Sequence, residues 1–278
     1  MSKNKFIHIE RVNEEIARIV FDNPPVNLIS PDTVSELHQV ITILKNDEQL
    51  KVAVFASEVD DFFFNHFDLS KVGSFPQPVS PNAIPIWTDI ILMLSRAPFI
   101  SIASIRGRTR GGGNELALAM DLRYASKEKA FFGQPEVGTG ILPGGGGSEW
   151  LPRFIGRDRA IEAILGSNDY DADTAERFGW VTRAISDTEL DGFVSNIAKR
   201  FASFDRQALI AAKSQINRAT LPPDNDFISA YKEFSNSMEW PSVLDRLRQM
   251  GLIVSRVGVG EMEKNLGYYL GPRSRSND

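Results

Sequence analysis

The 278-residue chain is acidic, with 36 Asp and Glu against 31 Lys and Arg, and 24% of its residues are charged. Its composition is typical of a globular protein, and without a long basic run the acidic balance argues against nucleic-acid binding. The absence of cysteine excludes disulfides, thiolate catalysis and Cys-ligated zinc. The polar first residues and the lack of a long apolar run predict neither a signal peptide nor a membrane span, so we expect a cytoplasmic protein.

Strands and helices are predicted to alternate through most of the chain. Ser30 is placed to cap a helix whose first residue is Pro31. A second helix is expected over 85–96, after a proline-rich loop over about 71–84. Short apolar runs indicate strands, the first two of them forming a hairpin. The expected strands are 5–10, 15–22, 51–57, 99–105, 122–126 and 180–185.

The last part of the chain has a different pattern. From about Phe201 onward the glycines thin out, and apolar residues recur at helical spacing. No repeat or low-complexity segment interrupts it. The sequence therefore predicts an α/β fold with a mixed core over residues 1–200 and a helical region over residues 201–278.

Two glycine-rich stretches, 111–113 and 138–147, lie directly against apolar segments. Neither fits the phosphate-loop pattern or the dinucleotide fingerprint, so they do not predict nucleotide binding. The apolar run 99–105 leads into the first stretch, and a helix is expected to begin there. Free backbone N–H groups at such a helix start bind an anion or a developing oxyanion.

Two glutamates accompany these glycines. Glu115 falls in the first turn of the expected helix, where it either complements the helix dipole at the surface or works beside the free N–H groups. Glu136 follows Pro135 in a turn flanked by apolar residues, ahead of a second glycine-rich helix start at Gly144. Two carboxylates near such donors are suited to abstract or deliver a proton beside a polarised carbonyl.

A family resemblance rests on three stretches of the sequence. GGGNELALAMDLRYAS and AFFGQPEVGTGILPGGGGSEWLPRFIG, followed by DADTAERFGWVTRAIS, resemble the motifs of the enoyl-CoA hydratase/isomerase (crotonase) superfamily. The resemblance runs over about residues 6–213 and is strongest over 111–185. It implies a spiral of ββα repeats, with C-terminal helices that build homotrimers or dimers of trimers. It also implies an acyl-thioester substrate that carries coenzyme A, with no separately bound cofactor.

The resemblance assigns roles to five residues. The backbone N–H groups of Phe67 and Gly112 would form the oxyanion hole for the thioester oxygen. Glu115 would activate the water that attacks Cβ, and Glu136 would exchange the proton at Cα. The backbone of Gly144 would help to orient the water. Members that only shift a double bond often need one of the two glutamates, so the presence of both favours hydration or dehydration.

Several segments depart from the family pattern. Asn65, His66 and Phe67 replace a small, glycine-containing segment, and the C-terminus lacks a clear basic and aromatic segment for coenzyme A. These departures keep other functions open. They are a CoA-independent hydrolase of a C–C bond in a diketone, an enoyl-CoA isomerase and a non-catalytic binding protein.

Arginine and histidine supply further candidates. Arg106, Arg108 and Arg110 either bind phosphate or carboxylate groups of a ligand or form structural and interface ion pairs. His66 is either an added acid–base group or a loop residue, and together with Asp68 and Arg110 it is a candidate substrate-binding residue. No metal site is expected, because the three histidines of the chain show no ligand spacing.

Overall fold

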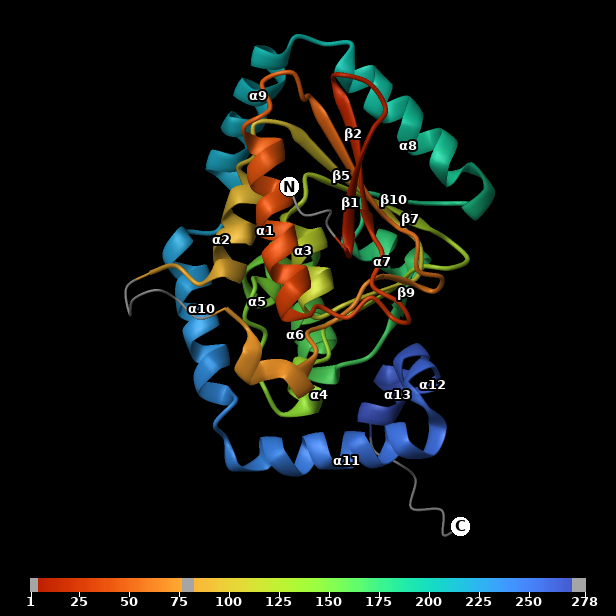
Figure 1. Ribbon diagram of the computed structural model, residues 1–278, viewed down its shortest axis with the longest axis vertical. Helices are drawn as coiled ribbons and strands as arrows, with labels where there is room; N and C mark the ends of the chain where they lie inside the picture. Colours follow the sequence, from red (N-terminus) through yellow and green to blue (C-terminus); the bar gives the residue numbers. More distant parts are fainter. Residues whose placement is uncertain (1–4, 77–82, 272–278) are drawn as a thin grey trace.

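Two sheets and an outer layer of helices make up the computed structural model, which describes residues 5–76 and 83–271 (Figure 1). In the six-stranded sheet only the first two strands pair antiparallel, which confirms the predicted hairpin, and all other neighbours are parallel. Its order is β1 (Ile7–Arg11), β2 (Ile16–Phe21), β3 (Val52–Ser57), β5 (Ile100–Ile105), β7 (Leu122–Ser126) and β10 (Arg183–Ile185).

The second sheet is built from short strands that the sequence pattern does not reveal. Its order is β4 (Phe62–Phe64), β6 (Arg108–Arg110), β8 (Phe131–Gly133) and β9 (Tyr170–Asp171). Three successive turns of the chain each add one strand to the larger sheet and one to this sheet before a helix follows. These turns are β3-β4-α2, β5-β6-α3 and β7-β8-α4. The α/β class and the ββα repeats are therefore confirmed.

The first helix, α1 (Pro31–Lys45), begins as predicted. The Ser30 hydroxyl accepts a hydrogen bond from the Thr33 N–H at 3.2 Å, and Pro31 occupies the first helical turn. The apolar side packs into the main core, with Leu37 and Ile41 fully buried. The second predicted helix is α2 (Ile86–Ser95). Most of the proline-rich loop that precedes it, residues 77–82, lies outside the described residues.

The remaining helices fall into two groups. The helices of the core are α3 (Gly112–Ala119), α4 (Glu136–Thr139), α5 (Gly147–Ile155), α6 (Arg157–Gly166), α7 (Ala172–Phe178) and α8 (Asp187–Ala202). The C-terminal helices are α9 (Arg206–Thr220), α10 (Asp224–Ser237), α11 (Pro241–Val257), α12 (Val259–Lys264) and α13 (Leu266–Leu270). Helices α9 to α11 run along the outside, and α12 and α13 return toward the core (Figure 1). Within the described ranges, no helix has the length and apolarity needed to cross a membrane.

Two of the arginines that precede the glycine triplet attach helices to the core. Arg106 donates to the Asp187 carboxylate at 2.8 Å and to the Asp191 carboxylate at 2.7 Å, and both partners belong to α8. Arg108 donates from Nε to the Lys264 carbonyl at the end of α12, 3.1 Å away. These contacts lie within one chain and support the structural role among the two predicted alternatives.

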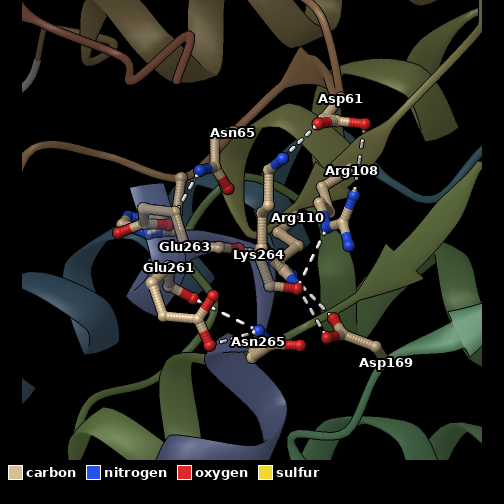
Figure 2. Close-up of polar contacts among 10 residues, drawn as sticks. Asp61, Asn65, Arg108, Arg110, Asp169, Glu261, Glu263, Lys264 and Asn265 are labelled. Carbon is tan, nitrogen blue, oxygen red and sulfur yellow. Dashed lines mark hydrogen bonds and ion pairs between the residues drawn. The ribbon is translucent and has the colours of Figure 1, made fainter. Parts of the chain in front are cut away.

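Arg110 is the buried member of this set. Its guanidinium makes two hydrogen bonds of 2.6 Å to the Asp169 carboxylate and a further one to the Glu263 carbonyl of α12 (Figure 2). Only 1% of its surface is exposed. Because its donors are directed at Asp169 and at the α12 backbone, Arg110 is not carried forward as a substrate-binding residue. It holds the returning C-terminal segment against β6.

Candidate active site

A cavity of about 170 Å³ lies between the core and α10. Glu115, Glu136, Gly144 and Gly145 supply its polar part. The rest of the wall is apolar or aromatic, and includes Val34, Phe67, Ile86, Trp87, Tyr231 and Phe234. A concave apolar pocket with a few convergent polar groups is the usual form of a small-molecule site. The two glutamates singled out by the sequence therefore face one pocket.

Glu115 is positioned by two backbone donors. The N–H groups of Gly145 and Gly147 donate to Oε1 of Glu115, at 2.8 Å and 3.0 Å. The side chain is buried, and this burial raises the pKa of Glu115, although the glycine hydrogen bonds oppose the rise. The surface alternative for Glu115 is thus excluded, because its carboxylate points inward at the second glycine-rich stretch.

Glu136 is held by a chain of amide side chains. The Trp180 indole donates to Asn114 at 2.8 Å, Asn114 donates to Gln134 at 2.7 Å, and Gln134 donates to Oε2 of Glu136 at 3.0 Å. Because each amide nitrogen faces an oxygen, the direction of the chain is fixed and Glu136 must accept. Burial, followed by the nearby charge of Glu115, raises the pKa of Glu136 to about 8. Glu136 therefore retains its proton at neutral pH.

Two backbone N–H groups are left over beside these carboxyls. Ile29 pairs with the segment around Phe67 through His66 O and Asp68 N, so the N–H of Phe67 points to the opposite side. Similarly, the N–H groups of residues 111 and 113 are used by the backbone, whereas the N–H of Gly112 between them is not. Among the described residues neither the Phe67 nor the Gly112 N–H has an acceptor. The two residues touch, because a β-carbon at Gly112 would lie 2.6 Å from the Phe67 ring.

Gly113 allows this close approach. A β-carbon there would lie 1.9 Å from the Phe64 carbonyl oxygen, and the Gly113 N–H donates to the Asn65 carbonyl at 3.0 Å. Any side chain at this position would separate the start of α3 from the segment that follows β4. The glycine triplet thus brings together two chain segments that carry the two free N–H groups.

His66 faces away from the role of a free acid–base group. Its Nδ1 lies 2.9 Å from the Phe67 carbonyl and its Nε2 lies 3.0 Å from the Glu263 carboxylate. Both ring nitrogens face acceptors, so the ring is an imidazolium that donates twice. Burial alone would lower the pKa of His66, but Glu263 outweighs it and the pKa is raised. His66 is therefore engaged with the C-terminal helix α12.

Asp68 also makes local contacts. Its carboxylate accepts from the Ser70 N–H at 3.2 Å and caps the short 3₁₀ helix Leu69–Ser74. It also pairs with Lys71 at 3.2 Å. Of the three candidate substrate-binding residues, none contributes to the polar part of the cavity. No group of three or more His, Asp or Glu in the part of the chain that the structure describes is arranged to hold a metal ion.

Sequence reasoning missed several residues near the site. Asn114 and Gln134 were within the quoted motifs, next to Glu115 and two residues before Glu136, and that proximity was an available signal. Glu263 and Trp87 carried no such signal. Glu263 reaches His66 across a sequence separation of 197 residues. Trp87 belongs to an ordinary apolar helix pattern.

Glu149 of α5 provides a prediction on stability. Its Oε2 is buried and has no hydrogen-bond partner within the described residues, and burial together with the charge of Glu115 raises the pKa of Glu149 to about 7. The folded pKa lies above the unfolded one, so the native protein loses stability as the pH rises from 4.5 through 7. We expect Glu149→Gln to stabilise the fold by about 1–3 kcal/mol at about pH 8 and to leave it unchanged at about pH 4. Urea unfolding at both pH values measures this, and equal effects at the two would contradict it.

Comparisons with known proteins agree with this geometry. The family model described as enoyl-CoA hydratase/isomerase matches residues 11–240. The chain therefore belongs to the enoyl-CoA hydratase/isomerase (crotonase) superfamily. A short-chain-enoyl-CoA hydratase of Clostridium acetobutylicum is 30% identical over 205 residues, which are 73% of this chain and 78% of that protein.

Solved structures give the same result over the full length. The crystal structure of a putative enoyl-CoA hydratase from Streptomyces avermitilis has a TM-score of 0.92 and 38% identity, covering 99% of both chains. A monofunctional enoyl-CoA isomerase from M. smegmatis has a TM-score of 0.66 and 26% identity, covering 81% of this chain and 98% of that one. Relatives named as hydratase and as isomerase thus share this fold.

Proposed function

We propose that this protein is an enoyl-CoA hydratase, which adds water across the α,β double bond of an acyl-CoA thioester. The observation that carries the proposal is the placement of two buried glutamates around one cavity, beside two backbone N–H groups that lack an acceptor among the described residues. Hydration needs these components together: a base for the water, an acid for Cα and donors for the enolate oxygen.

The reaction begins with the thioester carbonyl at the two free N–H groups of Phe67 and Gly112. Glu115 takes a proton from water, and the water oxygen forms its bond to Cβ. The electron pair of the double bond moves toward the carbonyl and gives an enolate, whose oxygen is stabilised by the two N–H groups. The enolate then takes the proton of Glu136 at Cα. Glu115 ends protonated and Glu136 ionised, and proton exchange with solvent restores both.

The pKa values fit this division of roles. Two carboxyls in one buried site do not readily ionise together, so the pair keeps one proton near neutral pH. The pKa of about 8 assigns this proton to Glu136, the acid of the hydration direction. Glu115, whose carboxylate accepts two backbone hydrogen bonds, is the partner that ionises first.

A pH profile follows from this pair. We expect kcat/KM for hydration to be bell-shaped and to fall above about pH 8, since Glu136 then loses the proton it must deliver. The fall at low pH corresponds to protonation of Glu115, whose pKa is raised above its usual value. Initial rates over a range of pH measure the two limbs. A rate that keeps rising well above pH 8 would show that Glu136 does not act as the acid.

The direct test is to mix the native protein with crotonyl-CoA and follow the absorbance of the conjugated thioester, with mass analysis of the product. Loss of the band with the gain of one water supports hydration. A migrated double bond without a change of mass would instead identify an isomerase.

One observation favours a second candidate, the CoA-independent hydrolysis of a C–C bond in a diketone. The Phe67 ring contacts both Phe75 and Trp87, with ring centroids 5.2 Å and 4.9 Å apart, and occupies space where the resemblance implies a small residue. Binding of coenzyme A past this ring is what the candidate denies. Cleavage of a β-diketone, with no change in any enoyl thioester, would select it.

A further inference from the structure

The indole N–H of Trp87 is a buried donor without an acceptor. Trp87 lies in the first turn of α2 with 2% of its surface exposed, and its Nε1 has no hydrogen-bond partner within the described residues. The ring lines the cavity and packs edge-on against the Phe67 ring. A buried donor without a partner is costly, by about 1–3 kcal/mol, and in native proteins it needs an explanation. An acceptor supplied by a ligand is one.

Gly145 shows what this donor faces. A β-carbon at Gly145 would lie 2.2 Å from Trp87 Nε1 and 2.5 Å from Glu115 Oε2, so both atoms border the space above this glycine. Oε1 of Glu115 is already occupied by the N–H groups of Gly145 and Gly147. Oε2 is therefore the oxygen of Glu115 that is left for a proton. One donor and one acceptor converge where Gly145 leaves room.

A single oxygen atom satisfies both groups. A water molecule placed there would donate one hydrogen to Glu115 Oε2 and accept the indole hydrogen through one lone pair. Its second lone pair would remain for the attack on Cβ. After the addition the same oxygen is the β-hydroxyl of the product, which keeps both contacts.

We propose that Trp87 Nε1–H is a substrate-binding donor to the oxygen that is added at Cβ, first as water and then as the β-hydroxyl of a 3-hydroxyacyl thioester. This inference rests on the proposed hydratase function. Trp87 thereby recognises the hydrated product class and distinguishes it from a saturated acyl thioester of the same length.

A purely structural role makes a different prediction. The indole is close enough to Glu115 to lower the pKa of that carboxyl, so a small shift would let Trp87 donate to Glu115 directly. In that case Trp87 would be a positioning residue. Its loss would then affect every ligand equally, whether or not the ligand carries a β-oxygen.

The test compares two ligands in Trp87→Phe, which keeps an aromatic ring and removes the N–H. The probes are 3-hydroxybutyryl-CoA and butyryl-CoA, each measured as an inhibitor of crotonyl-CoA hydration. We expect the inhibition constant of the hydroxyacyl thioester to rise about threefold to tenfold and that of butyryl-CoA to stay unchanged. Trp240→Phe is the matched control, since Trp240 is 45% exposed and outside the cavity, and it should change neither constant.

A spectroscopic measurement on the native protein covers the case in which the variant does not fold. The indole ¹⁵N–¹H signals of the four tryptophans are recorded while each thioester is added, and the signals of the other three are assigned with phenylalanine variants. The Trp87 signal is expected to move further with 3-hydroxybutyryl-CoA than with butyryl-CoA. Equal responses of the signal or of the inhibition constants would overturn the inference while the hydratase proposal stands. Failure of the native protein to bind either thioester would overturn both.

Discussion

Glu115→Gln and Glu136→Gln are each expected to lower kcat for hydration by about a hundredfold to ten-thousandfold, because each removes one partner of general acid–base catalysis. Glutamine keeps the size of the side chain and its acceptor oxygen, so KM should change far less than kcat. Initial rates with crotonyl-CoA measure the effect. Glu176→Gln, at an exposed position on α7, is the matched control and should retain full activity.

The two variants should also differ from one another. Glu136 is assigned to the proton at Cα, so Glu136→Gln should stop exchange of the Cα hydrogen of butyryl-CoA with deuterium from the solvent. Glu115→Gln should leave much of this exchange, since no water has to be activated for it. Loss of exchange in Glu115→Gln alone would reverse the assigned roles.

Glu263→Gln is expected to destabilise the protein by about 3–5 kcal/mol, the usual cost of removing one partner from a buried ion pair. Glu263 accepts from His66 at 3.0 Å and from Asn65 at 2.9 Å, and both partners lie beside the Phe67 donor (Figure 2). Without the carboxylate the His66 imidazolium would be left buried and unpaired. Urea unfolding of native protein and variant measures the loss, and Glu261→Gln, an exposed neighbour on α12, is the control.

The effect of Glu263→Gln should depend on pH. The pKa of His66 is raised above 6.5, so its stabilising contribution is present below that value and is lost as the pH rises through the folded pKa. Despite burial, His66 lowers the pKa of Glu263 below 4.5, so its contribution is present above that value and is lost as the pH falls through the folded pKa. The difference between native protein and variant should therefore be largest between 4.5 and 6.5. A difference that is constant with pH would contradict the ion pair.

The sequence predicts the parts of this protein that depend on local patterns. The strands of the larger sheet and the cap at Ser30 follow from apolar periodicity and from the residue types that begin a helix. The strands β4, β6 and β8 escaped prediction because each is three residues long, which is too short to establish a period. Arg108 and Arg110 looked like ligand or interface residues, since their partners Lys264 and Asp169 are distant in sequence.

The site was predictable to the extent that its residues sit in contiguous motifs. Glu115 and Glu136 could be named because the glycine stretches mark the backbone donors around them, although their facing one cavity is a property of the fold. The pairing of His66 with Glu263 and the position of Trp87 depend on the return of α12 and the packing of α2. No local pattern encodes such contacts. The trimeric assembly and the cytoplasmic location stay predictions.

The central claim is that Glu115 and Glu136 add water to an enoyl thioester held at Phe67 and Gly112. Its most direct test is the mass of the products when the native protein acts on crotonyl-CoA and a β-diketone together in ¹⁸O-labelled water. The account predicts a 3-hydroxyacyl-CoA that carries one labelled oxygen, and an intact diketone. An unchanged thioester beside a cleaved diketone, or a thioester isomerised without label, would contradict it.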